Sequence, residues 1–251
     1  MPLFQTDNLT LETQGDQGAI LSLHVAGRSL NVFTPQVLAD LDAALDRLAE
    51  MPALRVLGIK SGKSSGFMAG ADIQEFQKVQ TAADAEALSA TGQAVFNKLA
   101  ASRVPTVAVI QGSCLGGGLE FALACDYRLV IDHPKTQLGL PEIELGLLPA
   151  WGGTQRLPRV IGIERALQVI VGRKRLKARE ALSWGLADAV AANATDYSAE
   201  MRQLVQRALE LGKSARRGWP VRSWRQRLLE STGLGRRLLL RGAERILRRR
   251  T

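Results

Sequence analysis

Residues 106–125 read TVAVIQGSCLGGGLEFALAC, and this stretch combines three kinds of local structure. The apolar run Thr106–Gln111 predicts a buried strand, and Leu119–Cys125 predicts a short apolar helix. Between them, the glycine-rich turn Gly112–Gly118 allows a tight reversal and lets a ligand approach the backbone closely. A buried strand that leads through a turn into a buried helix is typical of layered α/β proteins.

The same alternation continues on both sides of this stretch. Strands are also expected at Leu9–Thr13, Ala19–Val25, Leu54–Lys60 and Tyr127–Ile131. Helices are expected at Pro35–Glu50, Ala71–Val79, Asp84–Ala101, Thr154–Val160, Glu164–Val171, Ala178–Trp184 and Ala199–Leu211. Ser61–Gly66 and the Gly- and Pro-rich segment Leu138–Gly153 are expected to be mostly loop. This order predicts an α/β structure that ends in a helical C-terminal region.

The composition excludes several classes of protein. Of the 251 residues, 46% are hydrophobic and 23% are charged, which is ordinary for a globular chain with a large core. No run reaches the roughly 18–20 apolar residues of a membrane span, and residues 1–13 lack the pattern of a secretory signal. The two cysteines, Cys114 and Cys125, indicate reduced thiols, and two histidines are too few for a histidine-rich metal site. We therefore expect a cytoplasmic protein with no bound metal.

The basic charge lies at the end of the chain. Residues 201–251 hold 15 Lys or Arg and 3 Asp or Glu, whereas residues 1–200 hold 18 and 21. Because the body of the chain is not basic, a nucleic-acid partner is not expected. Trp219 and Trp224 stand among the arginines of the tail, and they leave RNA binding by the tail as an alternative to a solvated helix face.

Three common catalytic motifs do not fit. In Gly112-Ser113-Cys114-Leu115-Gly116 the serine comes one place too early for the nucleophile motif G-x-S-x-G. Three residues separate Gly58 from Gly62-Lys63-Ser64, where a phosphate-binding P-loop needs four. The glycines 116–118 also lack the spacing of a dinucleotide-binding fingerprint. A serine hydrolase, a P-loop nucleotidase and a dinucleotide-dependent enzyme are therefore not indicated.

Two loops, Phe67–Asp72 and Gly112–Glu120, each lead from a predicted buried strand into a predicted helix. The first amides of a helix have no partner within the helix, so two such helix ends that face each other would bind an oxyanion. Each loop taken alone is better explained as a tight strand-to-helix turn.

Glu120 and Glu142 are the candidate acid–base groups. Glu120 lies in the first turn of an apolar helix, where a buried carboxylate requires a reason, and Glu142 lies in a Gly- and Pro-rich loop. Two carboxylates in one apolar pocket would have separated pKa values, which gives one acid and one base near neutral pH. The helix N-terminus would instead favour ionisation of Glu120, and either glutamate could be a solvated surface charge.

Taken together, the two loops, Pro141-Glu142 and the run Gly152–Pro158 resemble the enoyl-CoA hydratase/isomerase, or crotonase, superfamily in the order of their motifs. The resemblance covers roughly residues 10–190. Ser113–Glu120 and Pro134–Thr136 further resemble the N-terminal hydratase part of multifunctional fatty-acid oxidation α subunits.

The resemblance implies a fold and a set of site residues. The fold would be a spiral of β-β-α units over residues 1–190, followed by a helical, basic region over residues 191–251 that serves trimerisation or resembles a linker. The backbone N–H groups of Ala71 and Gly117 would form the oxyanion hole, and Glu120 and Glu142 would be catalytic. Further substrate-binding residues would be Ala69, Gly70, Asp72, Gly116, Ala150 and Trp151.

The implied activity is syn addition of water to trans-2-enoyl-CoA in fatty-acid β-oxidation, giving 3-hydroxyacyl-CoA. No cofactor would be needed, because coenzyme A is part of the substrate. The alternatives are a Δ3,Δ2-enoyl-CoA isomerase, which would need only Glu142, and a module that binds a partner or RNA through its basic tail. By the resemblance, Glu120 is the residue that favours hydration.

The sequence also departs from the family pattern. Ala150 stands where relatives usually have glycine, which would be strained if the backbone there needs a positive φ. Trp151 replaces a small residue and would either line the acyl pocket or serve packing. Gly233–Arg237 resembles a linker entry, so we expect the hydratase part of a longer protein, and a stand-alone hydratase with a basic tail is the alternative. Expected partners are further copies in a trimer or hexamer, or a dehydrogenase domain or thiolase subunit.

Overall fold

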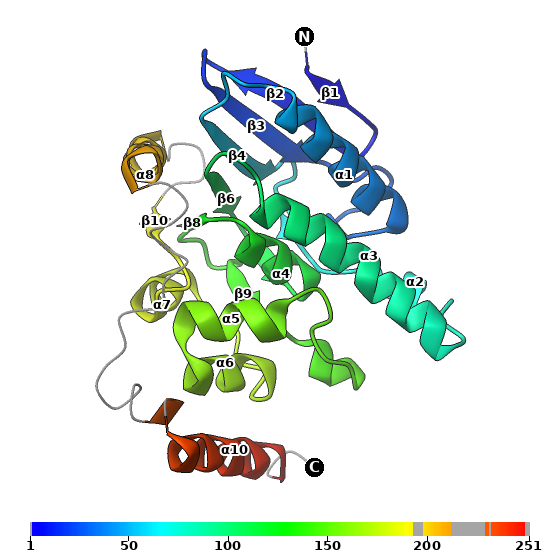
Figure 1. The fold of residues 1–251 in the computed structure, drawn as a ribbon, viewed down its shortest axis with the longest axis vertical. Helices are drawn as coiled ribbons and strands as arrows, with labels where there is room; N and C mark the ends of the chain where they lie inside the picture. Colours follow the sequence, from blue (N-terminus) through cyan, green and yellow to red (C-terminus); the bar gives the residue numbers. More distant parts are fainter. Residues whose placement is uncertain (1, 193–197, 212–228, 231, 249–251) are drawn as a thin grey trace.

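The computed structural model describes residues 2–192, 198–211, 229–230 and 232–248, and two sheets organise the fold (Figure 1). In the larger sheet the strand order is β1-β2-β3-β4-β6-β8-β10. The first three strands pair antiparallel, and the others pair parallel. The bounds are β1 (Phe4–Gln5), β2 (Leu9–Gln14), β3 (Gly18–Leu23), β4 (Val56–Ser61), β6 (Thr106–Ile110), β8 (Tyr127–Ile131) and β10 (Ala189–Ala191).

The smaller sheet consists of three short parallel strands, β5 (Gly66–Met68), β7 (Ser113–Leu115) and β9 (Gln137–Gly139). Each follows directly on a strand of the larger sheet, so every turn of the chain adds one strand to each sheet before a helix. This arrangement confirms the predicted α/β spiral of β-β-α units. It corrects the expectation that these three segments are turns or loops: a three-residue strand is too short for a periodic pattern and is defined by its neighbours.

Helices cover the sheets and close the turns of the spiral. They are α1 (Pro35–Ala49), α2 (Ile73–Phe76), α3 (Ala82–Ala100), α4 (Gly117–Ala124), α5 (Gly153–Ile161), α6 (Ile163–Ile170), α7 (Ala178–Trp184), α8 (Ser198–Leu211), α10 (Gly233–Arg248) and the 3₁₀ helix η1 (Glu142–Leu145). The Thr34 hydroxyl caps α1 by accepting from the Val37 amide at 3.2 Å, as its sequence predicts. The helix predicted over Ala71–Val79 is shorter than expected, because after α2 the chain tightens into a turn in which the Lys78 amide donates to the Glu75 carbonyl.

Helix α4 is the centre of the core, and all eight of its residues are buried. Phe33, Phe96 and Phe121 pack around it with ring centroids 5.3–5.5 Å apart. Because α4 is apolar on all sides, it is held between α3, α5 and the short strands instead of lying on a surface.

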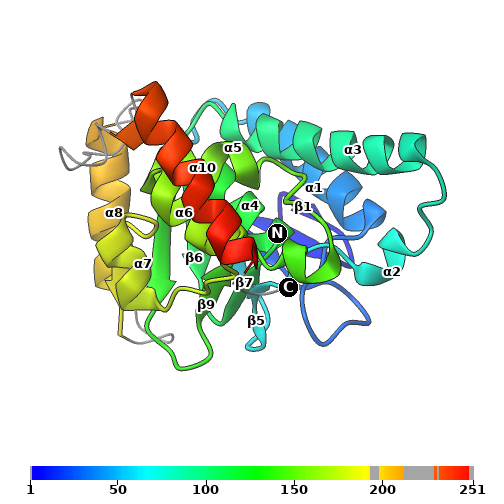
Figure 2. The same cartoon turned by 90° about the horizontal axis from the view of Figure 1, so that it is seen from below.

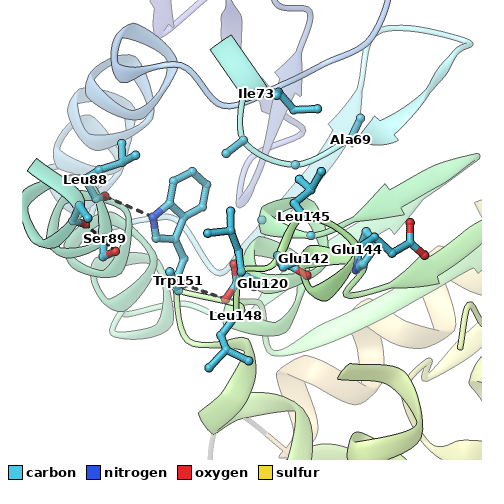
Figure 3. A pocket seen from close by; sticks show the side chains of 18 of the residues that line it. Ala69, Ile73, Leu88, Ser89, Glu120, Glu142, Glu144, Leu145, Leu148 and Trp151 are labelled. Atoms are coloured by element: carbon cyan, nitrogen blue, oxygen red, sulfur yellow. Dashed lines mark hydrogen bonds between the residues drawn. The ribbon is translucent and has the colours of Figure 1, made fainter. Parts of the chain in front are cut away.

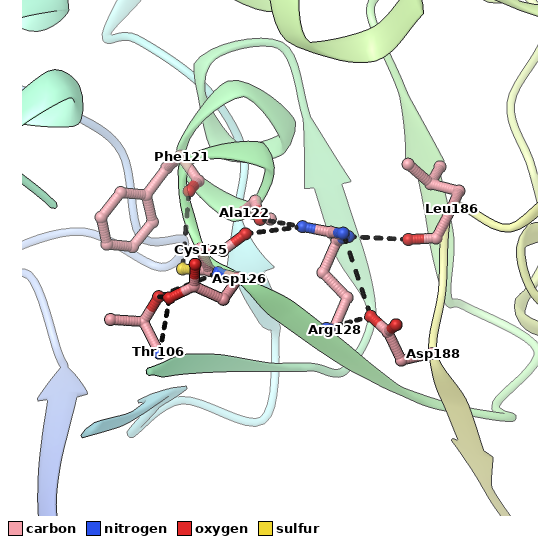
Figure 4. Close-up of polar contacts among 8 residues, drawn as sticks. All are labelled: Thr106, Phe121, Ala122, Cys125, Asp126, Arg128, Leu186 and Asp188. Atoms are coloured by element: carbon pink, nitrogen blue, oxygen red, sulfur yellow. Dashed lines mark hydrogen bonds and ion pairs between the residues drawn. The ribbon is translucent and has the colours of Figure 1, made fainter. Parts of the chain in front are cut away.

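A buried arginine satisfies the C-terminal end of α4 (Figure 4). The Arg128 guanidinium donates to the carbonyls of Ala122 and Cys125, both at 2.9 Å, and to that of Leu186 at 2.7 Å. The Asp188 carboxylate accepts from the Arg128 amide at 2.8 Å and lies 3.9 Å from the guanidinium. Two carbonyls at this end, those of Ala122 in the last turn and of the C-cap residue Cys125, are thereby bonded, and α4 is fixed at the end away from the cavity described below.

The C-terminal helices pack on two different faces. Helix α8 buries Leu204 and Ala208 against β8 and its neighbours, and α10 lies across α6 with Leu239 and Ala243 buried (Figure 2). Trp219 and Trp224, on which the RNA alternative depends, lie outside the described residues. Among the described helices, none combines the length and the hydrophobicity that crossing a membrane requires.

Candidate active site

A cavity of about 480 Å³ opens at the N-terminal end of α4, between α2, α3 and η1 (Figure 3). Nine of the ten site residues expected from the sequence line it. They are Ala69, Gly70, Ala71, Gly116, Gly117, Glu120, Glu142, Ala150 and Trp151. The tertiary structure therefore brings together four segments that lie up to about 80 residues apart in the chain.

The amides of Ala71 and Gly117 are neighbours in this cavity. A Cβ placed on Gly117 would lie 3.5 Å from the Ala71 nitrogen, and a Cβ lies about 2.5 Å from its own nitrogen, so the two nitrogens are within about 6 Å. Gly70 and Gly116 precede them with φ of +106° and +54°, which turns the chain before each amide. Within the described residues neither N–H donates a hydrogen bond. Both remain free to bind an oxyanion.

Glu120 is buried in the first turn of α4, with 2% of its surface exposed. Its Oε1 accepts from the amides of Trp151 and Gly153 at 2.8 and 2.7 Å, so the start of α5 is bonded directly to this side chain. Burial raises the pKa of Glu120 to about 6, while these two hydrogen bonds and the Arg156 guanidinium oppose the rise. The sequence left open whether burial or the groups that favour ionisation control the pKa of Glu120. Burial has the larger effect.

Glu142 enters the cavity from η1, and its carboxyl lies against Gly116. A Cβ placed on Gly116 would lie 3.3 Å from Glu142 Oε1, so only glycine fits beneath this carboxyl without a shift. Burial, together with the Glu120 charge, raises the pKa of Glu142 to about 7. Both carboxyl oxygens are buried and have no hydrogen-bond partner in the described part of the protein. They are therefore available to a group held in the cavity.

The two carboxyls differ in a way that suits acid–base chemistry. Burial raises the pKa of both toward neutral pH, and the pKa of Glu142 is raised further because that carboxyl also faces the Glu120 charge. One side chain can therefore accept a proton while the other donates one, within the same apolar enclosure.

Asp72 does not line the cavity, in contrast to the sequence expectation that it contacts substrate. Its carboxylate caps α2 by accepting from the Gln74 amide at 3.1 Å, and it forms an ion pair of 2.5 Å with Arg28. An aspartate just before a helix is a common N-cap, and here that local role accounts for the side chain.

The structure answers both questions raised by residues 150 and 151. Among the described residues only Arg173 combines a side chain with a positive φ, so Ala150 is not strained. The Trp151 indole serves packing and also lines the cavity: it is 4% exposed, and its Nε1 donates to the Leu88 carbonyl at 3.3 Å.

Several apolar residues at the cavity rim were not predicted. They are Ile73, Val79, Ala85, Leu88, Leu145, Leu147 and Leu148. Ile73, Leu145 and Leu148 expose 58%, 57% and 66% of their surface, which is unusual for large apolar side chains and indicates an apolar ligand. The leucines that follow Glu142, in a segment expected to be loop, are the feature of the sequence that could have indicated this rim.

Comparison with known proteins agrees with this geometry. The family model described as enoyl-CoA hydratase/isomerase matches residues 15–218. The chain belongs to the enoyl-CoA hydratase/isomerase family. It is 41% identical over 249 residues to the fatty acid oxidation complex subunit alpha of Shewanella sp. strain MR-4, which covers 98% of this chain and 34% of that protein. The chain thus spans about a third of the length of the curated relatives it matches.

Solved structures of the family share the fold. An enoyl-CoA hydratase of Geobacillus kaustophilus HTA426 superposes with a TM-score of 0.76 at 26% identity, covering 96% of this chain and 88% of that one. DspI of Pseudomonas aeruginosa superposes with a TM-score of 0.74 at 30% identity, covering 85% and 84%. These matches confirm the crotonase-like α/β fold that the motifs predicted.

Proposed function

We propose that this family member hydrates trans-2-enoyl thioesters of coenzyme A to 3-hydroxyacyl thioesters by syn addition, as in fatty-acid β-oxidation. One observation carries the proposal: two amides without a hydrogen-bond acceptor among the described residues, and two buried carboxyls with raised pKa values, line the same apolar cavity. Addition of water to a conjugated thioester needs donors for the developing enolate and a base and an acid for the two protons.

In the proposed reaction the Glu120 carboxylate takes a proton from water as the water oxygen forms a bond to Cβ. The electron pair of the Cα–Cβ double bond moves to the thioester, and the enolate oxygen accepts from the amides of Ala71 and Gly117. The protonated Glu142 then gives its proton to Cα, which restores the thioester carbonyl. One proton is gained at Glu120 and one lost at Glu142, so proton exchange with water resets the pair.

The start of α5 contributes by holding the base in place. Because the Trp151 and Gly153 amides bond one oxygen of Glu120, the other oxygen is left to face the water. Each oxyanion donor contributes roughly 10²–10³ in rate, and a positioned acid or base about 10²–10⁴.

A second candidate is Δ3,Δ2-enoyl-CoA isomerisation. This reaction would need Glu142 only. The oxygens of Glu142 have no hydrogen-bond partner among the described residues, and its pKa near 7 suits moving a proton between two carbons of one substrate. The Glu120→Gln variant separates the two functions, since it should abolish hydration and spare isomerisation.

The deciding experiment is a spectrophotometric assay of the purified chain on trans-2-enoyl-CoA and on the 3-enoyl isomer, with products identified by mass. Hydration that disappears in Glu120→Gln supports the proposal. Isomerisation that survives in Glu120→Gln, without hydration in the parent chain, would replace it. Absence of turnover with all chain lengths would favour the alternative of a module that binds a partner or RNA.

The rest of the proposal concerns surroundings and partners. No cofactor is required beyond the coenzyme A of the substrate. A cytoplasmic location is supported by the two cysteines, which are buried and form no disulfide with each other, as suits a reducing compartment. The proposed partners are further copies of this chain in a trimer or hexamer, or a dehydrogenase domain or thiolase subunit; the relatives' name, subunit alpha of a fatty acid oxidation complex, supports assembly with another subunit.

A further inference from the structure

Trp151 stands between the candidate active-site cavity and a second cavity. The second cavity, of about 640 Å³, lies between α3 and α5. Ser89, Ala150 and Trp151 line both cavities, and of these three Trp151 alone has a large side chain. Trp151 is therefore the one large side chain that the linings of the two cavities share.

The indole is held in this position by several contacts. Its ring packs edge-on against Phe33 and Phe96, with centroids 5.6 and 5.5 Å away and interplanar angles of 86° and 83°. Its Nε1 donates to the Leu88 carbonyl, and its backbone amide donates to Glu120, so neither the ring nor the main chain is free to swing aside (Figure 3).

Two glycines make room for the ring. A Cβ placed on Gly92, inside α3, would lie 2.3 Å from the indole Nε1, and a Cβ on Gly117 would lie 2.6 Å from its Cζ3. Glycine within a helix is destabilising, and here the glycine of α3 is explained by the indole that occupies the space of its missing side chain.

From this geometry we infer that Trp151, seated against Gly92, sets the acyl-chain length that the cavity accepts and restricts it to short chains. The inference rests on the proposed function, because it places a thioester oxygen at Gly117, directly beside the ring. A short acyl chain ends at the indole. A longer one has to turn along the open rim of Ile73 and Leu148, which are more than half exposed, so its additional methylene groups are only partly removed from water and add little affinity.

Binding of saturated acyl-CoA measures the partition without depending on turnover. We expect butyryl-, hexanoyl-, octanoyl- and decanoyl-CoA, titrated calorimetrically, to bind the parent chain with affinities that stop rising at the short members. In Trp151→Ala the two cavities join, and the ratio of decanoyl to butyryl affinity should rise at least about tenfold, because each newly buried methylene is worth about fourfold.

Two further variants test the inference even if Trp151→Ala does not fold. Trp151→Phe keeps an aromatic ring and should shift the ratio in the same direction by a smaller factor. Gly92→Ala should lower the affinity for hexanoyl-CoA relative to butyryl-CoA, since its methyl group pushes the indole, and it should have no such effect in the Trp151→Ala background. Trp184→Ala, on α7 and away from both cavities, is the matched control and should leave the ratio unchanged.

The outcomes separate this inference from the proposed function. If the parent chain hydrates enoyl-CoA but Trp151→Ala and Trp151→Phe keep its chain-length ratio, the partition role is wrong and the proposed reaction stands. If the parent chain hydrates no enoyl-CoA but the binding ratio shifts as expected, the reaction is wrong and the partition stands.

Discussion

The two ends of α4 both carry buried charged groups, and they differ in how those groups are satisfied. At the C-terminal end the Arg128 guanidinium bonds three carbonyls and lies beside Asp188. At the N-terminal end both Glu142 oxygens are buried without a partner, and the amides of Ala71 and Gly117 donate to no group within the described residues.

The difference shows where one helix serves stability and where it serves a ligand. A buried polar group with all its bonds made costs little and holds its neighbours in one geometry, whereas an unpartnered one costs folding free energy until a ligand supplies the bond. The satisfied end thus holds α4 in register, and the unsatisfied end keeps donors and acceptors for a ligand.

The largest effect is expected from Glu142→Gln. Hydration of crotonyl-CoA should fall by roughly 10²–10⁴, because the proton donor to Cα is lost, while saturated acyl-CoA still binds within a few-fold. The free energy of unfolding at pH 7 should not decrease, because an unpartnered carboxyl is replaced by a neutral amide. Turnover, calorimetry and urea unfolding check the three parts.

Glu12→Gln, at an exposed position of β2, is the control for this variant and should change none of these quantities. Full turnover by Glu142→Gln would remove Glu142 from the mechanism.

The opposite pattern is expected from Arg128→Met at the other end of α4. Loss of the buried guanidinium leaves three carbonyls without their donor and Asp188 without the opposite charge beside it. The free energy of unfolding should therefore decrease by about 3–5 kcal/mol. Turnover per folded molecule should stay within a few-fold of the parent chain. Arg179→Met, which removes an exposed ion pair with Asp132, should cost less than about 1 kcal/mol by the same urea titration.

A fall in turnover of folded Arg128→Met as large as that of Glu142→Gln would show that the two ends are not independent.

A smaller effect is expected on the pH dependence of stability. The pKa of Glu142 is raised from 4.5 to about 7 in the folded state, so below pH 4.5 the carboxyl is protonated in both states. As pH rises from 4.5 through 7, the unfolded state ionises first and the folded state loses up to about 3 kcal/mol of stability. Urea unfolding at several pH values should show this loss, and Glu142→Gln should reduce it. Equal slopes for both proteins would contradict the raised pKa.

The smallest effect is expected from Ala150→Gly, in the loop next to the cavity. Because Ala150 does not have a positive φ, glycine relieves no strain and should cost about 0.4–1 kcal/mol through the greater entropy of the unfolded chain. A gain in thermal stability would show that the alanine is strained after all.

Much of the larger sheet was predictable, and the smaller one was not. Strands such as β6 (Thr106–Ile110) and β8 (Tyr127–Ile131) are mostly apolar runs rich in branched residues, which favour buried parallel strands even though each contains one polar residue. Strands β5, β7 and β9 have three residues each, so no periodicity distinguishes them from turns. Their pairing exists because successive turns of the spiral place them side by side.

The candidate site divides in the same way. Glu120, Glu142 and the glycine loops were identified from residue type, order and resemblance. The apolar rim of Ile73, Leu145 and Leu148 was missed because these residues lie on α2, η1 and the following loop, and only folding collects them around one opening.

Chain order, residue chemistry and the resemblance of its motifs were enough to predict the α/β class, the family and the two glutamates that meet in the cavity, because apolar runs, glycines and carboxylates carry that information locally. Three-dimensional packing was needed to establish that burial outweighs the helix end at Glu120, that Asp72 caps a helix, and that Trp151 separates two cavities. These properties depend on which atoms from distant segments surround a group, and solvent exclusion is a property of the assembled fold.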